Sequence, residues 1–155
     1  MKQSIFRHHF LFTSVWLLLG ASIMAHAAEP EDIIKYRQNV MKSQGGHMAA
    51  AAAIIQGKVD FKDQLLTHAK ALEATTKFIP SMFPKDSDFG DTKALDAVWK
   101  NNAAFLKDAK NAQEKSLALL KAVEAGDTKA YGPRLKELSE TCKACHKDFR
   151  KEDNQ

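Results

Sequence analysis

Cys142, Cys145 and His146 form a Cys-x-x-Cys-His sequence near the C-terminal end of this 155-residue chain. The pattern is the attachment signature of a c-type haem: each thiol can form a thioether with a haem vinyl group, and the imidazole can ligate the iron. On a helix, positions i, i+3 and i+4 share one face. The motif therefore predicts a C-terminal helix that carries one covalent haem c on a single face.

Two other interpretations of the cysteine pair stay open at this point. In an oxidising compartment Cys142 and Cys145, the only cysteines of the chain, could form a disulfide. A zinc site would need two further ligands, and beyond the signal segment only His47 and His68 remain besides His146. The histidine directly after the second cysteine favours haem over both.

The first 27 residues have the pattern of a secretory signal peptide. Lys2 and Arg7 precede an apolar run over 10–23, and Ala25-His26-Ala27 is a small-x-small cleavage site. The run is shorter than the ~20 residues of a membrane span, although a retained N-terminal anchor is the competing interpretation. Thioethers of c-type haem are made on the exported side of a bacterial membrane. We therefore expect residues 28–155 to be a periplasmic domain without membrane contact after signal cleavage.

Charge and motif content exclude other classes of function. The formal net charge is +4, and cleavage removes two positive charges, so the remaining chain is close to neutral. Lysines are scattered among acids and no patch combines basic and aromatic residues, which argues against nucleic-acid binding. No Ser-His-Asp set or carboxylate pair is placed by a motif, so we do not expect an enzyme. Partners are expected to be redox proteins, which the charge pattern does not identify.

Apolar residues recur with helical spacing in four segments: 31–56, 61–78, 92–125 and 129–151. No run alternates with period two, so strands are not expected. Short connections between the first and second segments, and between the third and fourth, favour antiparallel neighbours. The sequence predicts an all-α protein: an antiparallel up-down four-helix bundle with haem bound near the C-terminal helix.

The chain resembles cytochrome c′ and its class II relatives, which are secreted four-helix proteins with the haem motif near the C-terminus. Residues 30–38 (PEDIIKYRQ) are similar to the family's opening helix, and residues 142–151 (CKACHKDFRK) to its closing helix. Trp99 and Phe105 match aromatic positions of its third helix. The resemblance covers the chain from residue 28 onward and implies one covalent haem c.

The family divides by its sixth haem ligand, which lies on the first helix. Low-spin members of the cytochrome c-556 type use a methionine, whereas high-spin members have an apolar residue, often leucine, and five-coordinate iron. Counted through Tyr36-Arg37-Gln38, that position is Met41. The resemblance implies His146 as proximal and Met41 as distal iron ligand. Met48 lies on nearly the same face, roughly 10 Å further along, and remains a rival; Met82 is a remote third choice.

Three functions are compatible with the sequence, and the first two differ in whether Met41 ligates the iron. Histidine–methionine ligation keeps iron six-coordinate and raises its potential, which predicts an electron-transfer protein. The alternative is a five-coordinate, high-spin cytochrome c′ that binds nitric oxide or carbon monoxide. A haem-free helical interaction protein would require the motif to be accidental.

Further residues receive roles mainly from the resemblance. Arg37 is implied to approach a haem propionate and Trp99 to contact the haem. Arg150, one turn after His146, would contact the haem edge or be a solvated charge at a helix end.

Two further expectations concern the outer surface. His47 and His68 are interpreted as surface residues. Class II relatives often form dimers through their first two helices, and the alanine run over 49–53 would permit close packing in a homodimer.

Overall fold

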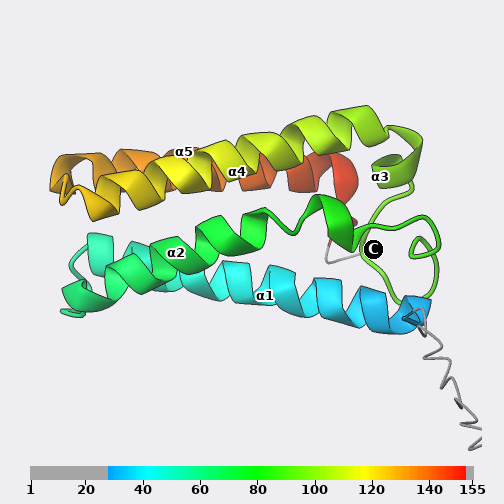
Figure 1. The fold of residues 1–155 in the computed structure, drawn as a ribbon, viewed down its shortest axis with the longest axis horizontal. Helices are drawn as coiled ribbons and strands as arrows, with labels where there is room; N and C mark the ends of the chain where they lie inside the picture. Colours follow the sequence, from blue (N-terminus) through cyan, green and yellow to red (C-terminus); the bar gives the residue numbers. More distant parts are fainter. Residues whose placement is uncertain (1–27, 153–155) are drawn as a thin grey trace, which may run out of the picture.

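Four long helices form the molecule, with short helical turns between them (Figure 1). In this computed structural model, which describes residues 28–152, α1 packs on α2 and α5, and α4 packs on the same two helices. The predicted all-α antiparallel four-helix bundle is confirmed. The expected signal peptide lies outside the described residues. The elements are α1 (Pro30–Ile55), η1 (Lys62–Gln64), α2 (Leu65–Thr76), η2 (Pro80–Met82), α3 (Ala97–Lys100), α4 (Asn102–Glu124) and α5 (Thr128–Phe149).

Two of the long helices end in the same glycine-dependent turn. After α1, the Gly57 N–H donates to the Ile54 carbonyl at 3.0 Å and the Lys58 N–H donates to the Ala53 carbonyl at 2.9 Å. This Schellman arrangement needs a left-handed residue, and Gly57 has a φ of 68°. Gly126 repeats the turn after α4, with the same φ. Both glycines reverse the chain so that α2 and α5 return antiparallel.

The third predicted helix, 92–125, is shorter than expected. It is split into α3 and α4 at Asn101, whose φ of −118° and ψ of 48° are not helical. The residues before α3 are extended, because they pair with the end of α5: the Leu95 N–H donates to the Phe149 carbonyl at 3.0 Å. The first ten residues of the expected helix therefore do not continue α4. Residues 92–95 pack in a non-helical conformation against the end of α5, and α3 is a separate helical turn.

The buried apolar side chains form two clusters along the bundle. The turn-end cluster lies toward the α1–α2 and α4–α5 turns, and the loop-end cluster lies toward the long connection between α2 and α4. The turn-end cluster consists of Ala51, Ile54, Leu65, Ala69, Leu72, Leu119, Leu120, Leu135 and Leu138. The loop-end cluster consists of Ile79, Met82, Val98, Phe105, Ala109 and Phe149.

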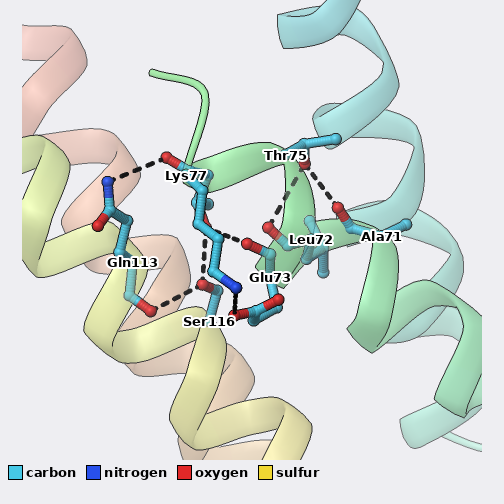
Figure 2. A network of polar contacts seen from close by, with 8 residues as sticks. Ala71, Leu72, Glu73, Thr75, Lys77, Gln113 and Ser116 are labelled. Atoms are coloured by element: carbon cyan, nitrogen blue, oxygen red, sulfur yellow. Dashed lines mark hydrogen bonds and ion pairs between the residues drawn. The ribbon is translucent and has the colours of Figure 1, made fainter. Parts of the chain in front are cut away.

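A small polar contact joins α2 to α4 inside the bundle (Figure 2). The hydroxyl oxygens of Thr76 and Ser116 lie 2.8 Å apart, and both side chains are buried. Each hydroxyl also lies within hydrogen-bond distance of a carbonyl of its own helix, Glu73 for Thr76 and Gln113 for Ser116. One hydroxyl can donate to the other while the second donates to its carbonyl, so neither loses its partner on burial.

Candidate haem-binding site

The Cys-x-x-Cys-His motif lies in the second half of α5, as the sequence predicts. Cys142 and Cys145 are half-buried and His146 is more exposed. Cys142 packs against the turn-end cluster, whereas Cys145 packs against the loop-end cluster. The motif therefore lies across the boundary between the two cores, on one face of one helix.

Both cysteines are free thiols, so the structure does not pair them in a disulfide. Burial raises the pKa of the Cys145 thiol to about 12, and Asp108, Cys142 and Asp148 add to this effect. Burial also raises the pKa of Cys142. For His146, desolvation and then the charge of Arg150 lower the pKa. The imidazole is thus favoured in its neutral form, which is the form that ligates a metal.

The two candidate distal methionines lie on α1 beside different cores. Met41 packs against the loop-end cluster, as does Cys145. Met48 packs against the turn-end cluster, as does Cys142. Because His146 directly follows Cys145, Met41 shares its core with the histidine end of the motif. Met82, the third choice, is itself a buried member of the loop-end cluster.

A cavity of about 530 Å³ opens between α1 and α5, beside the motif. Its α1 wall is made largely of small residues, whose side chains leave the space between the two helices unfilled. The lining residues are Gly45, Met48, Ala49 and Ala52 from α1, Gln56 directly after it, and Leu135, Lys136, Ser139, Glu140 and Lys143 from α5.

Arg37 is the most constrained charged side chain near the loop-end cluster. It is 3% exposed, and Nη1 donates to the Met82 carbonyl (3.2 Å) and to Ser87 Oγ (2.9 Å). Nη2 donates to the Ser87 carbonyl (3.1 Å) and to Thr92 Oγ1 (2.8 Å). Desolvation lowers its pKa. Within residues 28–152 its hydrogen-bond partners are neutral oxygens, so this buried cation has no carboxylate partner.

Phe83 lies beside both Arg37 and Trp99, and the sequence pattern does not predict this contact. The guanidinium carbon of Arg37 lies 4.5 Å from the ring centroid of Phe83 and 5.9 Å from that of Trp99. The Phe83 ring packs edge-on against Phe105 at 4.8 Å, and Trp99 Nε1 donates to the Pro84 carbonyl at 3.0 Å. Phe83 lies in the long loop, where no periodic signal marks a residue as buried.

Arg150 lies at the end of α5, where the backbone is already extended and forms a bridge with Ala94. It is half-buried, so it is not a fully solvated terminal charge. Arg150 and Arg37 come from opposite ends of the chain and border the same end of the bundle.

The interpretation of His47 and His68 as surface residues holds only in part. Both are half-buried, and their Nδ1 atoms lie 2.9 Å apart across the α1–α2 contact. The side chains are 21 residues apart in sequence, so only the packing of the two helices brings them together.

The residues present fit a covalently attached haem. Two free thiols and an imidazole share one face of α5, a methionine thioether lies across the same core on α1, and a cavity separates these helices beside the motif. The fold and the donor set together define a class II c-type cytochrome.

Comparison with known proteins agrees with this class. The family model of cytochrome c′ matches residues 32–150. Cytochrome c′ of Rhodospirillum rubrum is 34% identical, over 85% of this chain and 90% of the relative. Cytochrome c-556 of Agrobacterium tumefaciens is 32% identical, over 76% of this chain and 95% of the relative. The solved structure of cytochrome c′ from Shewanella frigidimarina is 28% identical, covers 82% of this chain and 100% of its own, and superposes with a TM-score of 0.76.

The chain belongs to the cytochrome c′ family. It is an electron-transfer haem protein that binds a covalent c-type haem with iron, and the prediction of this cofactor from the Cys-x-x-Cys-His motif is confirmed.

Proposed function

We propose that this chain carries electrons in the periplasm with one haem c, held by thioethers to Cys142 and Cys145 and ligated by His146 and Met41. The observation that carries the proposal is the position of Met41, which packs against the same core as Cys145 and Trp99. A thioether sulfur at this place is a suitable second axial ligand for haem iron.

When bound, the haem supplies a one-electron couple between ferric and ferrous iron. The residues of this chain would keep the ligation of the iron unchanged when it is oxidised or reduced. With His146 and Met41 both as ligands, the iron would keep the same two protein ligands in either oxidation state. Methionine–histidine ligation also raises the potential. No site for a substrate is then open at the iron, and we include in the proposal that the protein is not an enzyme.

Arg37 and the residues around it have a supporting role in this proposal. A buried guanidinium whose partners are neutral oxygens is a favourable neighbour for the carboxylate of a haem propionate. Trp99 would pack against the haem beside it. Arg150, at the end of α5, would place a second positive charge near the haem edge or near His146, whose pKa it already lowers.

A second candidate function is a five-coordinate, high-spin cytochrome c′ that binds nitric oxide or carbon monoxide. Relatives named cytochrome c′ outnumber those named cytochrome c-556 among those compared. Family resemblance therefore supports this candidate better than the first. The side chain at position 41 supports the first, because it is a methionine rather than the leucine that is frequent in high-spin members.

The replacement Met41→Leu separates the two candidates. If Met41 ligates iron, the wild type is low-spin, and the variant becomes high-spin and binds carbon monoxide when ferrous. Met48→Leu is the matched control: a near-volume-conserving change on the same helix that should cost only about 1 kcal/mol of stability. Optical and electron paramagnetic resonance spectra of the three proteins report the spin state.

A wild type that is already high-spin would establish the second candidate. If Met48→Leu changes the spin state and Met41→Leu does not, Met48 is the ligand and the family register used for Met41 is wrong.

The remaining parts of the proposal concern the cell. Residues 1–27 would direct export and be removed, and 28–155 would form the haem domain. None of the helices in residues 28–152 has the length and hydropathy needed to cross a bilayer. The partners would be redox proteins, and a homodimer through α1 and α2 is the form suggested by class II relatives; nucleic acid is not among the partners.

A further inference from the structure

His47 on α1 and His68 on α2 form a pair that the haem site does not use. Their Nδ1 atoms lie 2.9 Å apart, and the ring centroids lie 5.2 Å apart with the ring planes inclined at 54°. Hydrogens on both facing nitrogens would collide at this separation. At most one proton therefore lies between the rings, and at least one nitrogen lone pair points at the partner ring.

The nitrogen separation matches one kind of metal geometry. Imidazole nitrogens bind divalent first-row metals at about 2.0–2.1 Å. Two nitrogens in adjacent positions of a square-planar site are then about 2.9 Å apart, whereas a tetrahedral site needs about 3.3 Å. The 2.9 Å separation is that of the hydrogen bond between the two rings, and it is also close to the square-planar value, the geometry preferred by Cu²⁺ and Ni²⁺.

We propose that His47 and His68 form a two-histidine site for a square-planar divalent transition metal, with Cu²⁺ bound most tightly. Each ring would contribute Nδ1, and the metal would replace the proton shared by the pair. Both side chains are half-buried, which leaves the site open to solvent.

The remaining positions of this site would be taken by water. In the part of the chain from 28 to 152, no third histidine, cysteine or carboxylate joins the pair into a larger cluster. Because α1 and α2 each supply one ligand, a bound ion would tie these two helices together. The site depends on neither Met41 nor the spin state of the haem.

Titration of the mature, haem-loaded protein with Cu²⁺ tests the proposal. The protein carries no affinity tag and is kept ferric, so that Cu²⁺ has no haem electron to accept. We expect one Cu²⁺ per chain, a copper resonance spectrum split by two nitrogens, and no change in the optical spectrum of the haem. Zn²⁺ should bind more weakly, because nitrogen ligands generally bind Cu²⁺ more tightly than Zn²⁺ and because the tetrahedral preference of Zn²⁺ requires the rings to move apart.

His47→Gln and His68→Gln should each weaken Cu²⁺ binding by at least about tenfold, because each removes half of the protein's ligands. Lys70→Gln is the matched control: its side chain is exposed, two positions after His68, and the affinity should not change. Cu²⁺ should also raise the unfolding temperature of the wild type but of neither histidine variant. The unfolding temperature and haem spectrum of each variant without metal show whether it is folded.

Unchanged Cu²⁺ affinity in folded His47→Gln or His68→Gln would overturn the site, and so would a copper spectrum split by a single nitrogen. Tighter binding of Zn²⁺ than of Cu²⁺ would overturn the proposed preference for Cu²⁺.

Discussion

At the scale of single residues, hydrogen bonds from Arg37 fix the long loop between α2 and α4 to helix α1. Its guanidinium donates four hydrogen bonds to oxygens of Met82, Ser87 and Thr92, which are 45 to 55 residues away in sequence. Burying a cation without a carboxylate partner is costly, and here hydrogen bonds and the faces of two aromatic rings offset that cost.

We expect Arg37→Ala to destabilise the haem-loaded protein by roughly 3 kcal/mol, because buried carbonyl and hydroxyl groups lose their donor. Arg37→Lys should lose less, since a lysine keeps the charge but cannot reproduce the planar fork. Denaturant unfolding gives both values. The neighbouring Gln38→Ala is the control: this side chain is half-buried and makes one solvent-exposed hydrogen bond to the Asp91 carbonyl, so its loss should cost under about 1 kcal/mol. Equal losses at the two positions would contradict this role for Arg37.

At the scale of helices, the backbone conformation of a glycine determines whether its replacement by alanine stabilises or destabilises the protein. Gly126 has a φ of 68° at the end of α4, a region that side chains with a Cβ enter only with strain. Gly46 lies within the unbroken helix α1, and a Cβ added there would meet no atom within 4 Å.

Gly126→Ala should therefore destabilise the protein by about 1 kcal/mol, through the left-handed turn that joins α4 to α5. Gly46→Ala should stabilise it by roughly 0.5–1 kcal/mol, because alanine loses less backbone entropy in a helix. Denaturation midpoints of the haem-loaded variants measure both effects. If both replacements shift the denaturation midpoint in the same direction, backbone conformation does not determine the change in stability, and the space around the added Cβ does.

At the scale of the whole molecule, the haem motif joins the two cores of the bundle. Cys142 packs with the turn-end cluster and Cys145 with the loop-end cluster. A haem attached to both cysteines would therefore contact both halves of the bundle and close the space between α1 and α5.

Expression with haem-maturation machinery should yield a protein that begins at Ala28 and whose intact mass includes one haem. The double replacement of Cys142 and Cys145 by serine removes both thioether positions, so its mass after denaturation should equal that of the bare polypeptide. Intact-mass spectrometry decides both points. A wild-type mass without haem, or one that retains residues 1–27, would contradict the proposed maturation.

The amino-acid sequence by itself determined the features that depend on local spacing. The Cys-x-x-Cys-His motif specifies the cofactor because its geometry is complete within five consecutive residues. Helical periodicity places both ends of α1, α2 and α5, and the end of α4, to within four residues, and Gly57 and Gly126 mark where α1 and α4 end. The resemblance to class II relatives, counted through Tyr36-Arg37-Gln38, implies Met41 as the candidate ligand, whereas spacing alone does not separate it from Met48.

Only the tertiary structure decided features that depend on residues far apart in the chain. The segment before α3 is extended because it pairs with the end of α5, which overrides the helical pattern that starts near residue 92. Arg37 is buried among loop residues, and His47 faces His68, because the bundle brings these segments together. The physical reason is the same in each case: the partners are separated by 20 to 60 residues, and no local periodicity encodes which side chains of two packed segments will meet.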